Sequence, residues 1–482
     1  MILTILPCYD IIFLSILRIA LLRGDYMFDI YKDKDKHIHF TGIGGISMSG
    51  LAIILLDRGY RVSGSDRSNS PLLEKLRRLG ATIYIGHAAE NVKDADMVVY
   101  TAAIQDDNPE LQEARHLNIP TVDRAEFLGA MMKHFPKAVG VSGTHGKTTT
   151  TSMLSLMLLE GGLDPTIMVG GELDAIGGNV RPGSSPYMVA ESCEYKGSFL
   201  KFFPNIGIIL NIDADHLDFY KDINDIYNTF LKFSKNIPED GLLIGCAEDS
   251  RVMDIIKQAS CKVLTYGINK GDFTAGSISY NSLGHPSFEV LHNGSPLGYV
   301  QLSVPGEHNI LNSLAAISCG YYLGLSFDVM ASSLHSYSGT HRRFEKKGEK
   351  DGVIIIDDYA HHPTEIKATI RAALNYPHKK LYCVFQPHTY TRTYTLFKEF
   401  TEAFHGLDKL ILVDIYAARE KDTGIVSSSM LREAICKRGV NCQYAHDFSS
   451  ALKILKKELK DGDVVITMGA GDVFKIGEMY LK

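Results

Sequence analysis

Short apolar runs rich in β-branched residues alternate with longer helical patterns from residue 36 to the C-terminus. Near-continuous apolar strands separated by helices are typical of parallel sheets that are covered on both faces. At about 100–200 residues per domain, a chain of 482 residues forms two to four domains. The sequence therefore predicts a multidomain α/β protein with mainly parallel sheets. The runs are His37–Thr41, Met97–Thr101, Ala138–Ser142, Met188–Ala190, Gly207–Asn211, Val353–Asp357, Lys380–Phe385, Lys409–Val413 and Val464–Met468.

The composition is that of an ordinary globular protein, with 45% hydrophobic and 22% charged residues. The formal net charge of −6 gives no global positive field that would attract nucleic acid, so we expect no nucleic-acid partner. None of the eight cysteines forms a Cys-x-x-Cys pair, so neither a zinc knuckle nor a thioredoxin-type redox motif is visible. Dispersed cysteines in a chain of this length indicate reduced thiols and a cytoplasmic protein.

Residues 1–36 differ from the rest of the chain. The apolar run Ile11–Leu22 is interrupted by Arg18 and is shorter than the roughly 20 residues that span a bilayer. It also lacks the positive start and the small-residue cleavage site of a signal peptide. Met27 directly precedes the first organised segment. We therefore expect a leader or a mis-assigned start without stable membrane insertion, and a weak membrane anchor is the alternative.

The remaining sequence divides into three blocks. A strand followed by a glycine turn opens the first block, 37–136, and a second strand–glycine turn opens the middle block, 137–338. Within the middle block, short strands rich in Gly, Asn and Ser between Thr265 and Val304 predict an antiparallel excursion. A third series of alternating strands and helices occupies residues 339–482.

The middle block opens with the pattern of a phosphate-binding loop. The buried-strand pattern Ala138–Ser142 is followed by a glycine-containing turn and then by a helical stretch, Thr150–Leu159. Glycines let backbone N–H groups turn inward, and the helix N-terminus adds partial positive charge. Within the turn, Lys147 suits the β- and γ-phosphates and Thr148 suits Mg²⁺. The turn consists of Gly143, Thr144, His145, Gly146, Lys147, Thr148 and Thr149.

The phosphate loop departs from the generic P-loop, because Val141 occupies the position of the first glycine. The loop is therefore a shorter variant. The alternative interpretation is a tight glycine turn that carries a surface lysine, but the flanking strand and helix favour nucleotide binding.

Two later segments place polar side chains at the carboxyl ends of apolar strands. Glu191 and Glu194 follow the strand at 188–190, and residues 211–218 follow the strand at 207–210. Ligands gather beyond the carboxyl ends of parallel strands, so we expect Glu191, His216 and Thr148 to converge on a Mg²⁺ ion bound to the triphosphate. The acidic residues of the second segment, Asp213, Asp215 and Asp218, lack the glycine and terminal glutamate of an EF-hand, which excludes a calcium loop of that type. Helix capping by Asp215 or Asp218 is the alternative.

These motifs resemble the Mur ligases of peptidoglycan synthesis. The resemblance extends in order from about His37 to the C-terminus, so only the first 26 to 36 residues fall outside it. It implies three domains: an N-terminal Rossmann-like UDP-binding domain, a central ATP-binding domain and a C-terminal Rossmann-like domain. The motifs that carry it are Gly143–Thr149, Glu191, Asn211-x-x-x-Asp215-His216-x-Asp218, Gly306-Glu-His-Asn309-Ile-Leu-Asn312, His341-Arg-Arg343-Phe344, Asp357-Asp-Tyr359-Ala-His361-His362-Pro363-Thr-Glu365 and Gln386-Pro-His388-Thr-Tyr390-Thr-Arg392.

In the first block, the resemblance assigns the glycine turn to the diphosphate of a UDP-sugar. The turn looks superficially like a dinucleotide fingerprint, but the third glycine would fall at Ser47, so NAD binding is a weak interpretation. The implied UDP-sugar residues are Gly42, Gly44, Gly45, Ser65, Asp66 and, from the third block, His361.

The resemblance assigns ATP to the phosphate loop, Asn309, Asn312 and Arg343, and catalysis to Lys147, Glu191 and His216. Capping of the helix after Gly306 is the alternative role for Asn309. The implied L-alanine residues are Tyr359, His388 and Arg392, and Arg392 suits the carboxylate because a guanidinium pairs with it through two hydrogen bonds.

Adjacent His361 and His362 invite a zinc hypothesis, but neighbouring side chains on an extended segment point apart, so one shared metal is not expected. A structural loop held by Pro363 is the alternative. Thr389 and Ala360 depart from the arginine and glycine that some relatives carry, which affects only the detailed contacts to alanine.

The later motifs are most similar to the alanine-adding members of the family. They imply ATP- and Mg²⁺-dependent joining of L-alanine to the lactyl carboxylate of UDP-N-acetylmuramate through an acyl phosphate, in a cytoplasmic monomer or weak homo-oligomer. Domain closure would keep water from the acyl phosphate. The alternatives are a recycling ligase that adds a preformed peptide to the same sugar nucleotide, a non-catalytic nucleotide-gated binding protein, and a dehydrogenase.

Overall fold

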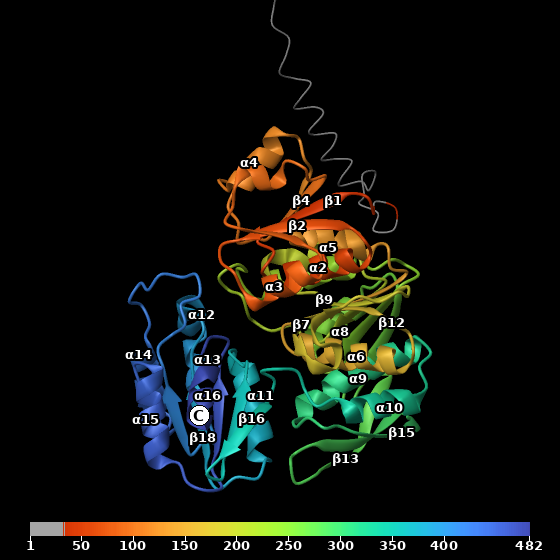
Figure 1. Ribbon diagram of the computed structural model, residues 1–482. Coiled ribbons are helices and arrows are strands. Elements are labelled where there is room, and N and C mark those ends of the chain that lie inside the picture. The colour runs from red at the N-terminus through yellow and green to blue at the C-terminus, as the bar shows by residue number, and fades with distance from the viewer. Residues whose placement is uncertain (1–31, 33) are drawn as a thin grey trace, which may run out of the picture. The chain divides into compact units, whose positions relative to one another are not determined.

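The computed structural model describes residue 32 and residues 34–482 (Figure 1). The predicted leader therefore lies almost entirely outside the described residues, and the run Ile11–Leu22 lies wholly outside them. The chain forms two compact units. One contains the described residues up to Pro136 together with Lys201–Phe203, and the other contains Lys137–Leu200 and Pro204–Lys482. Within residues 34–482, no helix is long and apolar enough to cross a membrane.

The first unit is built on a five-stranded parallel sheet in the order β3-β2-β1-β4-β5. This order reverses direction between β1 and β4, and ligands of doubly wound folds bind at such a switch point. The strands are β1 His37–Thr41, β2 Arg61–Asp66, β3 Thr82–Ile85, β4 Met97–Tyr100 and β5 Thr121–Asp123. The helices are α2 Ile46–Asp57, α3 Pro71–Arg78, α4 Pro109–His116 and α5 Arg124–Met132, with a 3₁₀ turn at Ala89–Val92.

A buried carboxylate ties the elements of this unit together. Glu110, in the first turn of α4, is fully buried. It accepts hydrogen bonds from Ser65 Oγ at 2.7 Å and from Asn91 Nδ2 at 2.7 Å. The buried ring of His39 lies 3.5 Å away and that of His87 lies 3.4 Å away. Burial by itself raises the pKa of Glu110, but these partners outweigh burial and lower the pKa to about 2.

The second unit begins with a ten-stranded sheet in the order β15-β14-β13-β12-β11-β10-β6-β9-β7-β8. Strands β6, β7 and β9 to β12 run parallel, whereas β13 to β15 form the antiparallel excursion that the sequence predicts. The parallel strands are β6 Lys137–Ser142, β7 Thr166–Leu173, β9 Tyr187–Glu191, β10 Ile206–Ile209, β11 Leu242–Cys246 and β12 Lys262–Tyr266. The others are β8 Gly178–Arg181, β13 Phe273–Tyr280, β14 Pro286–His292 and β15 Ser295–Gln301.

Helices pack against this sheet through an apolar core that contains Val139, Leu154, Ile208 and Leu314. Helices α6 and α9 lie side by side (Figure 1). The helices of this part are α6 Lys147–Glu160, α7 Ile223–Ser234, α8 Ser250–Ile256, α9 Glu307–Tyr322 and α10 Phe327–Ser336, with 3₁₀ turns at Asp174–Ile176 and Tyr195–Lys201.

The C-terminal part of the second unit has a six-stranded sheet in the order β16-β17-β21-β18-β19-β20. Only β16 is antiparallel to its neighbour within this sheet. The strands are β16 Glu345–Lys350, β17 Val353–Asp358, β18 Leu381–Phe385, β19 Lys409–Leu412, β20 Cys442–Tyr444 and β21 Val464–Met468. The helices are α11 Pro363–Leu374, α12 Tyr390–Thr395, α13 Phe397–Thr401, α14 Ser428–Lys437, α15 Phe448–Glu458 and α16 Phe474–Leu481.

We predict that Glu110→Gln destabilises the protein at neutral pH and that the effect fades in acid. The folded-state pKa is depressed from 4.5 to about 2, so the stabilisation is complete above pH 4.5 and is lost as the pH falls towards 2. At one pKa unit per 1.4 kcal/mol, the full contribution is about 3 kcal/mol. Thermal unfolding at pH 7, 4 and 3 measures the difference between the two proteins. A difference that stays constant over this range would contradict the prediction.

Candidate active site

The loop between β6 and α6 passes so close to its neighbours that two of its positions require glycine. Gly143 has a φ of +139°, and a Cβ atom there would lie 2.9 Å from Leu210 Cβ. Gly146 has a φ of +84°, and a Cβ atom there would lie 2.5 Å from Asn312 Oδ1. Both residues therefore allow a backbone approach that no other residue permits. The loop turns tightly into the N-terminus of α6, as a phosphate site requires.

The segment after β10 holds this loop in place. Because β10 pairs with β6 in parallel, the carboxyl ends of the two strands lie side by side. The His145 N–H donates to Asn211 Oδ1 at 2.8 Å, and Asn211 Nδ2 donates back to the His145 carbonyl at 3.0 Å. The Asp213 N–H donates to Thr144 Oγ1 at 2.9 Å. The conformation of the loop is thus set by hydrogen bonds with a segment about 66 residues further along the chain.

Lys147 lies at the start of α6 and is bound by its own loop. Its Nζ donates to the Gly143 carbonyl at 2.5 Å and to the Thr144 carbonyl at 2.9 Å. Its third contact is an ion pair with Glu194 Oε2 at 2.9 Å. Burial opposes the charged form of Lys147, but the carboxylate of Glu194 raises its pKa above the ordinary lysine value.

The predicted metal-binding residues lie around this lysine, but the carboxylate closest to Lys147 and His216 is not the one expected. His216 Nε2 lies 3.7 Å from Glu194 Oε1. Glu191, at the end of β9, instead accepts a hydrogen bond from the Gly170 N–H at 2.6 Å. The structure therefore brings Lys147 and His216 together through Glu194, and it places Glu191 beside β7. The hydroxyl-bearing Thr148 follows Lys147 in α6 and is buried.

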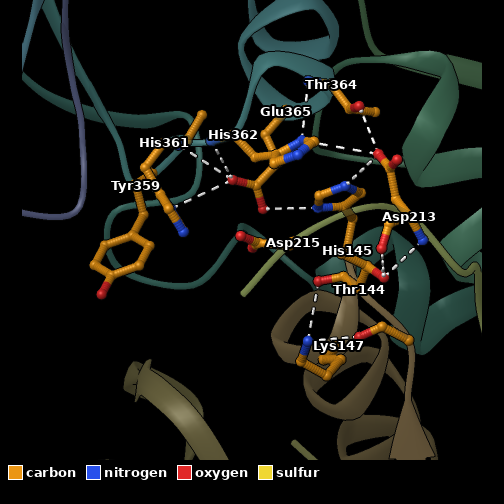
Figure 2. A network of polar contacts seen from close by, with 12 residues as sticks. Thr144, His145, Lys147, Asp213, Asp215, Tyr359, His361, His362, Thr364 and Glu365 are labelled. Carbon is orange, nitrogen blue, oxygen red and sulfur yellow. Dashed lines mark hydrogen bonds and ion pairs between the residues drawn. The ribbon is translucent and has the colours of Figure 1, made fainter. Parts of the chain in front are cut away.

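A hydrogen-bonded network joins the phosphate loop to the C-terminal part of the second unit (Figure 2). His145 Nε2 lies 3.0 Å from Asp213 Oδ2, and its Nδ1 lies 3.4 Å from Glu365 Oε1. Thr364 Oγ1 donates to the same Asp213 oxygen at 2.7 Å. Burial lowers the pKa of His145, but the two carboxylates outweigh burial and raise the pKa to about 9. His145 is therefore an imidazolium held between two carboxylates at neutral pH.

His145, Asp213 and His362 lie close enough together to suggest a metal site, since their ligand atoms are all within 4.8 Å. Their ring nitrogens already have partners. His362 caps α11 by accepting the Thr364 N–H at its Nδ1, and its Nε2 lies 3.1 Å from the Ala214 carbonyl. His361 Nδ1 instead lies 3.0 Å from the Tyr359 carbonyl. The two adjacent histidines thus have separate partners.

A cavity of about 440 Å³ opens beside the phosphate loop. Asn312 Nδ2 donates to Asn309 Oδ1 at 3.0 Å, and Asn309 Nδ2 donates to the Pro305 carbonyl at 2.8 Å. Gly306, rather than Asn309, is the N-cap of α9. The predicted ATP residues that line the cavity are His145, Gly146, Thr149, Asn309, Asn312 and Arg343.

Arg342 and Arg343 have different surroundings although they are adjacent. The Arg342 guanidinium donates to Asp357 Oδ2 at 3.0 Å and to the Gly469 carbonyl at 2.6 Å, which commits it to holding the C-terminal sheet together. Both guanidinium groups lie against the Tyr359 ring, but only that of Arg343 lies near Glu365 Oε1, at 3.9 Å, and lines the cavity. The structure therefore leaves Arg343 as the arginine beside the candidate nucleotide site.

The residues predicted for L-alanine form one cluster. Arg392 donates to Asp215 Oδ1 through Nε at 3.0 Å and through a terminal nitrogen at 2.9 Å. Another terminal nitrogen lies 2.9 Å from His388 Nδ1. The rings of His361 and His388 lie 5.7 Å apart, and the rings of His361 and Tyr359 lie 5.4 Å apart. The surroundings of Arg392 are thus already suited to a carboxylate.

Burial keeps the two histidines of this cluster neutral. It lowers the pKa of His361 to about 3 and that of His388 to about 4. Burial acts in the opposite direction on Asp215, but the neighbouring Arg392 outweighs it and lowers the pKa of Asp215 well below the ordinary value. At neutral pH the cluster therefore contains one guanidinium, one carboxylate and two neutral imidazoles.

In the first unit, the predicted UDP-sugar residues meet at the carboxyl ends of β1 and β2. The N–H groups of Gly42 and Ile43 donate to the Ser65 carbonyl at 2.8 and 3.0 Å. The Gly44 N–H donates to Asp66 Oδ2 at 2.9 Å. Gly45 is the N-cap of α2. His361, which the resemblance assigns to the same ligand, belongs to the second unit.

The capping alternative for Asp215 and Asp218 is wrong. The N-cap of α7 is Asp222, whose side chain accepts the N–H groups of Asn224 and Asp225. Asp215 pairs with Arg392, and Asp218 accepts a hydrogen bond from the Tyr195 hydroxyl. The residue that caps the helix, Asp222, is also an aspartate, but it lies four residues after Asp218.

Three polar residues of the site were not predicted as site residues: Glu194, Asp213 and Glu365. Glu194 and Asp213 stand in the segments that the sequence analysis singled out, so their position after apolar strands was the available signal. Glu365 follows the paired histidines at the start of α11, where an acidic residue also suits the helix N-terminus. Its contact with His145 depends on packing between distant segments.

Comparison with known proteins finds one family along most of the chain. Three family models match: "Mur ligase family, catalytic domain" over residues 37–136, "Mur ligase middle domain" over 141–320 and "Mur ligase, glutamate ligase domain" over 342–471. A UDP-N-acetylmuramate–L-alanine ligase of Clostridium novyi is 59% identical over 455 residues, which cover 94% of this chain and 99% of that protein.

Two solved structures are also similar. The UDP-N-acetylmuramate-alanine ligase of Thermotoga maritima is 30% identical with a TM-score of 0.78, covering 92% of this chain and 98% of that one. A murein peptide ligase of Psychrobacter arcticus is 24% identical with a TM-score of 0.68, covering 92% and 98%. The second similarity concerns the fold alone.

We predict that His145→Gln lowers the free energy of unfolding by about 3 kcal/mol at pH 6 and has little effect above pH 9. The folded-state pKa is raised from 6.5 to about 9, so the stabilisation is complete below pH 6.5 and is lost as the pH rises through 9. Thermal unfolding at pH 6, 8 and 10 measures the effect. His116→Gln is the matched control, because the His116 side chain is 78% exposed. An effect of His145→Gln that does not shrink between pH 6 and pH 10 would refute the imidazolium assignment.

Proposed function

Because the chain belongs to the Mur ligase family, we propose that it joins L-alanine to the lactyl carboxylate of UDP-N-acetylmuramate, with ATP as the energy source. The observation that carries this function is the 59% identity to a UDP-N-acetylmuramate–L-alanine ligase over 94% of the chain. The reaction yields ADP and phosphate and contributes to peptidoglycan synthesis. The nucleotide-linked substrate and ATP support a cytoplasmic location for the enzyme.

The cavity beside the phosphate loop supports the binding of ATP. The loop N–H groups and the N-terminus of α6 suit the phosphates, and Lys147 supplies a positive charge at the β/γ end. The amides of Asn309 and Asn312 offer hydrogen bonds to the adenine edge from α9. Arg343 borders the same cavity from the C-terminal part of the unit.

Mg²⁺ fits the oxygen-rich corner between α6, β7 and β9. A Cβ atom at Gly170 would lie 2.5 Å from Glu191 Oε2, and one at Gly171 would lie 3.3 Å from Thr148 Cγ2, so two glycines keep this corner open. Hydroxyl and carboxylate oxygens are ligands that Mg²⁺ prefers. Thr148 and Glu191 border this corner and would hold the ion, and His216, which lies beside Glu194 in the segment after β10, is the third ligand that we propose. The ion supplies charge neutralisation on the phosphates during transfer.

The reaction follows from what these residues can do. Lys147 stabilises negative charge as the γ-phosphoryl group moves from ATP to the lactyl carboxylate, which forms an acyl phosphate and ADP. The amine of L-alanine attacks the acyl carbon, the tetrahedral intermediate collapses to the amide, and phosphate leaves. Arg392 orients the alanine carboxylate. His361 and His388 are neutral at pH 7 and therefore place no positive charge beside the attacking amine.

The alternatives receive less support. A recycling ligase is disfavoured, because two solved recycling ligases are 24% and 29% identical to this chain, whereas the alanine ligase of C. novyi is 59% identical. A nucleotide-gated binding protein would need neither the carboxylates nor His216 beside Lys147. A dehydrogenase is disfavoured because Asp66, in the position of the ribose-binding carboxylate, accepts the Gly44 N–H instead.

The test of the function is phosphate release from ATP and Mg²⁺ in the presence of UDP-N-acetylmuramate. We expect release to depend on L-alanine and to fall at least 100-fold in Lys147→Ala, because the phosphoryl group loses its main protein cation. The tripeptide L-alanyl-γ-D-glutamyl-diaminopimelate replaces L-alanine in a parallel assay. Release with the tripeptide but not with L-alanine would identify a recycling enzyme, and release with neither would reject the ligase.

We predict that Arg392→Lys raises the KM for L-alanine roughly 10- to 100-fold, which is the loss expected for a charge-assisted hydrogen bond worth about 1.5–3 kcal/mol. A lysine retains the charge but cannot reproduce the planar set of donors. Steady-state kinetics with varied L-alanine measures the change, and the KM for UDP-N-acetylmuramate serves as the internal control. An unchanged KM for L-alanine would remove Arg392 from the amino-acid site.

A further inference from the structure

Glu194 occupies a central position among charged groups that the reaction uses, although its own role is unassigned. It lies just after β9, and its side chain is only 3% exposed. Its Oε2 atom accepts a hydrogen bond from Lys147 Nζ at 2.9 Å, and its Oε1 atom lies 3.3 Å from the same Nζ and 3.7 Å from His216 Nε2. Both oxygens of this carboxylate thus contact Lys147, and Oε1 also faces His216.

The backbone around Glu194 holds this carboxylate in place. Its carbonyl accepts hydrogen bonds from the Tyr220 hydroxyl and from the Gly197 N–H. Lys196 and Gly197 both have positive φ angles, so the chain turns sharply directly after Glu194. Tyr220 is itself buried, in the segment that also carries His216. The position of Glu194 is therefore determined from two separate parts of the fold.

Lys147 has no hydrogen-bonding capacity left in this arrangement. An ammonium group has three donors, and those of Lys147 meet the Gly143 carbonyl, the Thr144 carbonyl and Glu194. A buried ammonium without a counter-ion is costly. A triphosphate brings its own negative charge to this loop, so it competes with Glu194 for the same lysine.

We propose that Glu194 is a positioning residue that holds Lys147 through its carboxylate and orients His216 through Oε1, and that it yields Lys147 to the nucleotide phosphates. Before nucleotide binds, Glu194 is the counter-ion of Lys147. Once the phosphates have taken over the ammonium group, the carboxylate continues to orient His216. The expected effect of Glu194 on the reaction rate rests on the proposed ligase function. Its expected effect on nucleotide binding does not, because nucleotide can bind without ligation.

The first test is the affinity for ADP in EDTA, measured by titration calorimetry on the full chain. We expect Glu194→Gln to bind ADP about 3- to 10-fold more tightly than the wild type, because the neutral amide competes less strongly for Lys147. Glu239→Gln removes an equal charge from an exposed position before β11 and should leave the affinity unchanged. ADP binding to Glu194→Gln that is weaker than in the wild type would overturn the proposal.

A double-mutant cycle shows whether the effect passes through the lysine. In a Lys147→Met background, the tightening caused by Glu194→Gln should disappear, because the competing pair no longer exists. Tightening of the same size in both backgrounds would mean that Glu194 acts on the nucleotide by another route, and the proposal would be wrong.

The second test is the ligation rate. We expect Glu194→Gln to lower kcat at least 10-fold despite its tighter ADP binding, because His216 loses the charge that orients it. If Glu194 had a merely structural role, Glu194→Gln would weaken nucleotide binding and lower kcat together. That result, or an unchanged kcat, would contradict the proposal. If the wild-type chain shows no ligation, the proposed function fails, and the ADP titrations still decide the role of Glu194.

The conservative variant provides a second approach if Glu194→Gln does not fold. Glu194→Asp keeps the charge but shortens the side chain, so it cannot reach both partners. We expect a reduced kcat with an ADP affinity within twofold of the wild type. A wild-type kcat in Glu194→Asp would show that the reach of the side chain is unimportant and would overturn the proposal.

Discussion

The parallel pairing of β6 with β10 is the constraint on which the rest of the second unit depends. It brings the carboxyl ends of the two strands together, so that the backbone of Gly143 meets Leu210 at a distance that excludes any side chain. The side-chain amide of Asn211 then fixes the loop, because it accepts a hydrogen bond from the His145 N–H and donates one to the His145 carbonyl. The position of Lys147, at the end of this loop, is defined because its ammonium group donates to the fixed carbonyls of Gly143 and Thr144.

The charges of the site are arranged as pairs whose members come from different segments. Lys147 pairs with Glu194, and Arg392 pairs with Asp215. The His145 imidazolium lies between one carboxylate from the segment after β10 and another from α11. Each buried charge is costly by itself and is stabilised only when its partner arrives. The pairs of Arg392 with Asp215 and of His145 with Glu365 therefore bind the C-terminal part to the nucleotide site, and all the pairs keep their charged groups ionised.

Several features could be predicted from the sequence because they depend on local patterns. Strands β1 and β21 have the predicted bounds, and other predicted strands differ by a residue or two at their ends. The phosphate loop was identified from its glycines and its flanking elements. The helix cap at Asp222 was missed, because Asp215 and Asp218 have the same capping chemistry and stand closer to the preceding strand. The roles of the polar site residues that follow from the resemblance remain predictions.

The sequence by itself determined the alternation of strands and helices, the glycine turns and the residue types available for phosphate and metal chemistry, since these depend on neighbours within a few positions. Only the tertiary structure decided which carboxylate pairs with which cationic side chain. Glu191 and Glu194 are three residues apart and chemically equal, yet one accepts the Gly170 N–H while the other pairs with Lys147. That choice depends on the sharp turn after β9 and on the packing of Tyr220. Such pairings join residues that are far apart in the sequence, and a local sequence pattern does not show which distant residues lie close together in the folded protein.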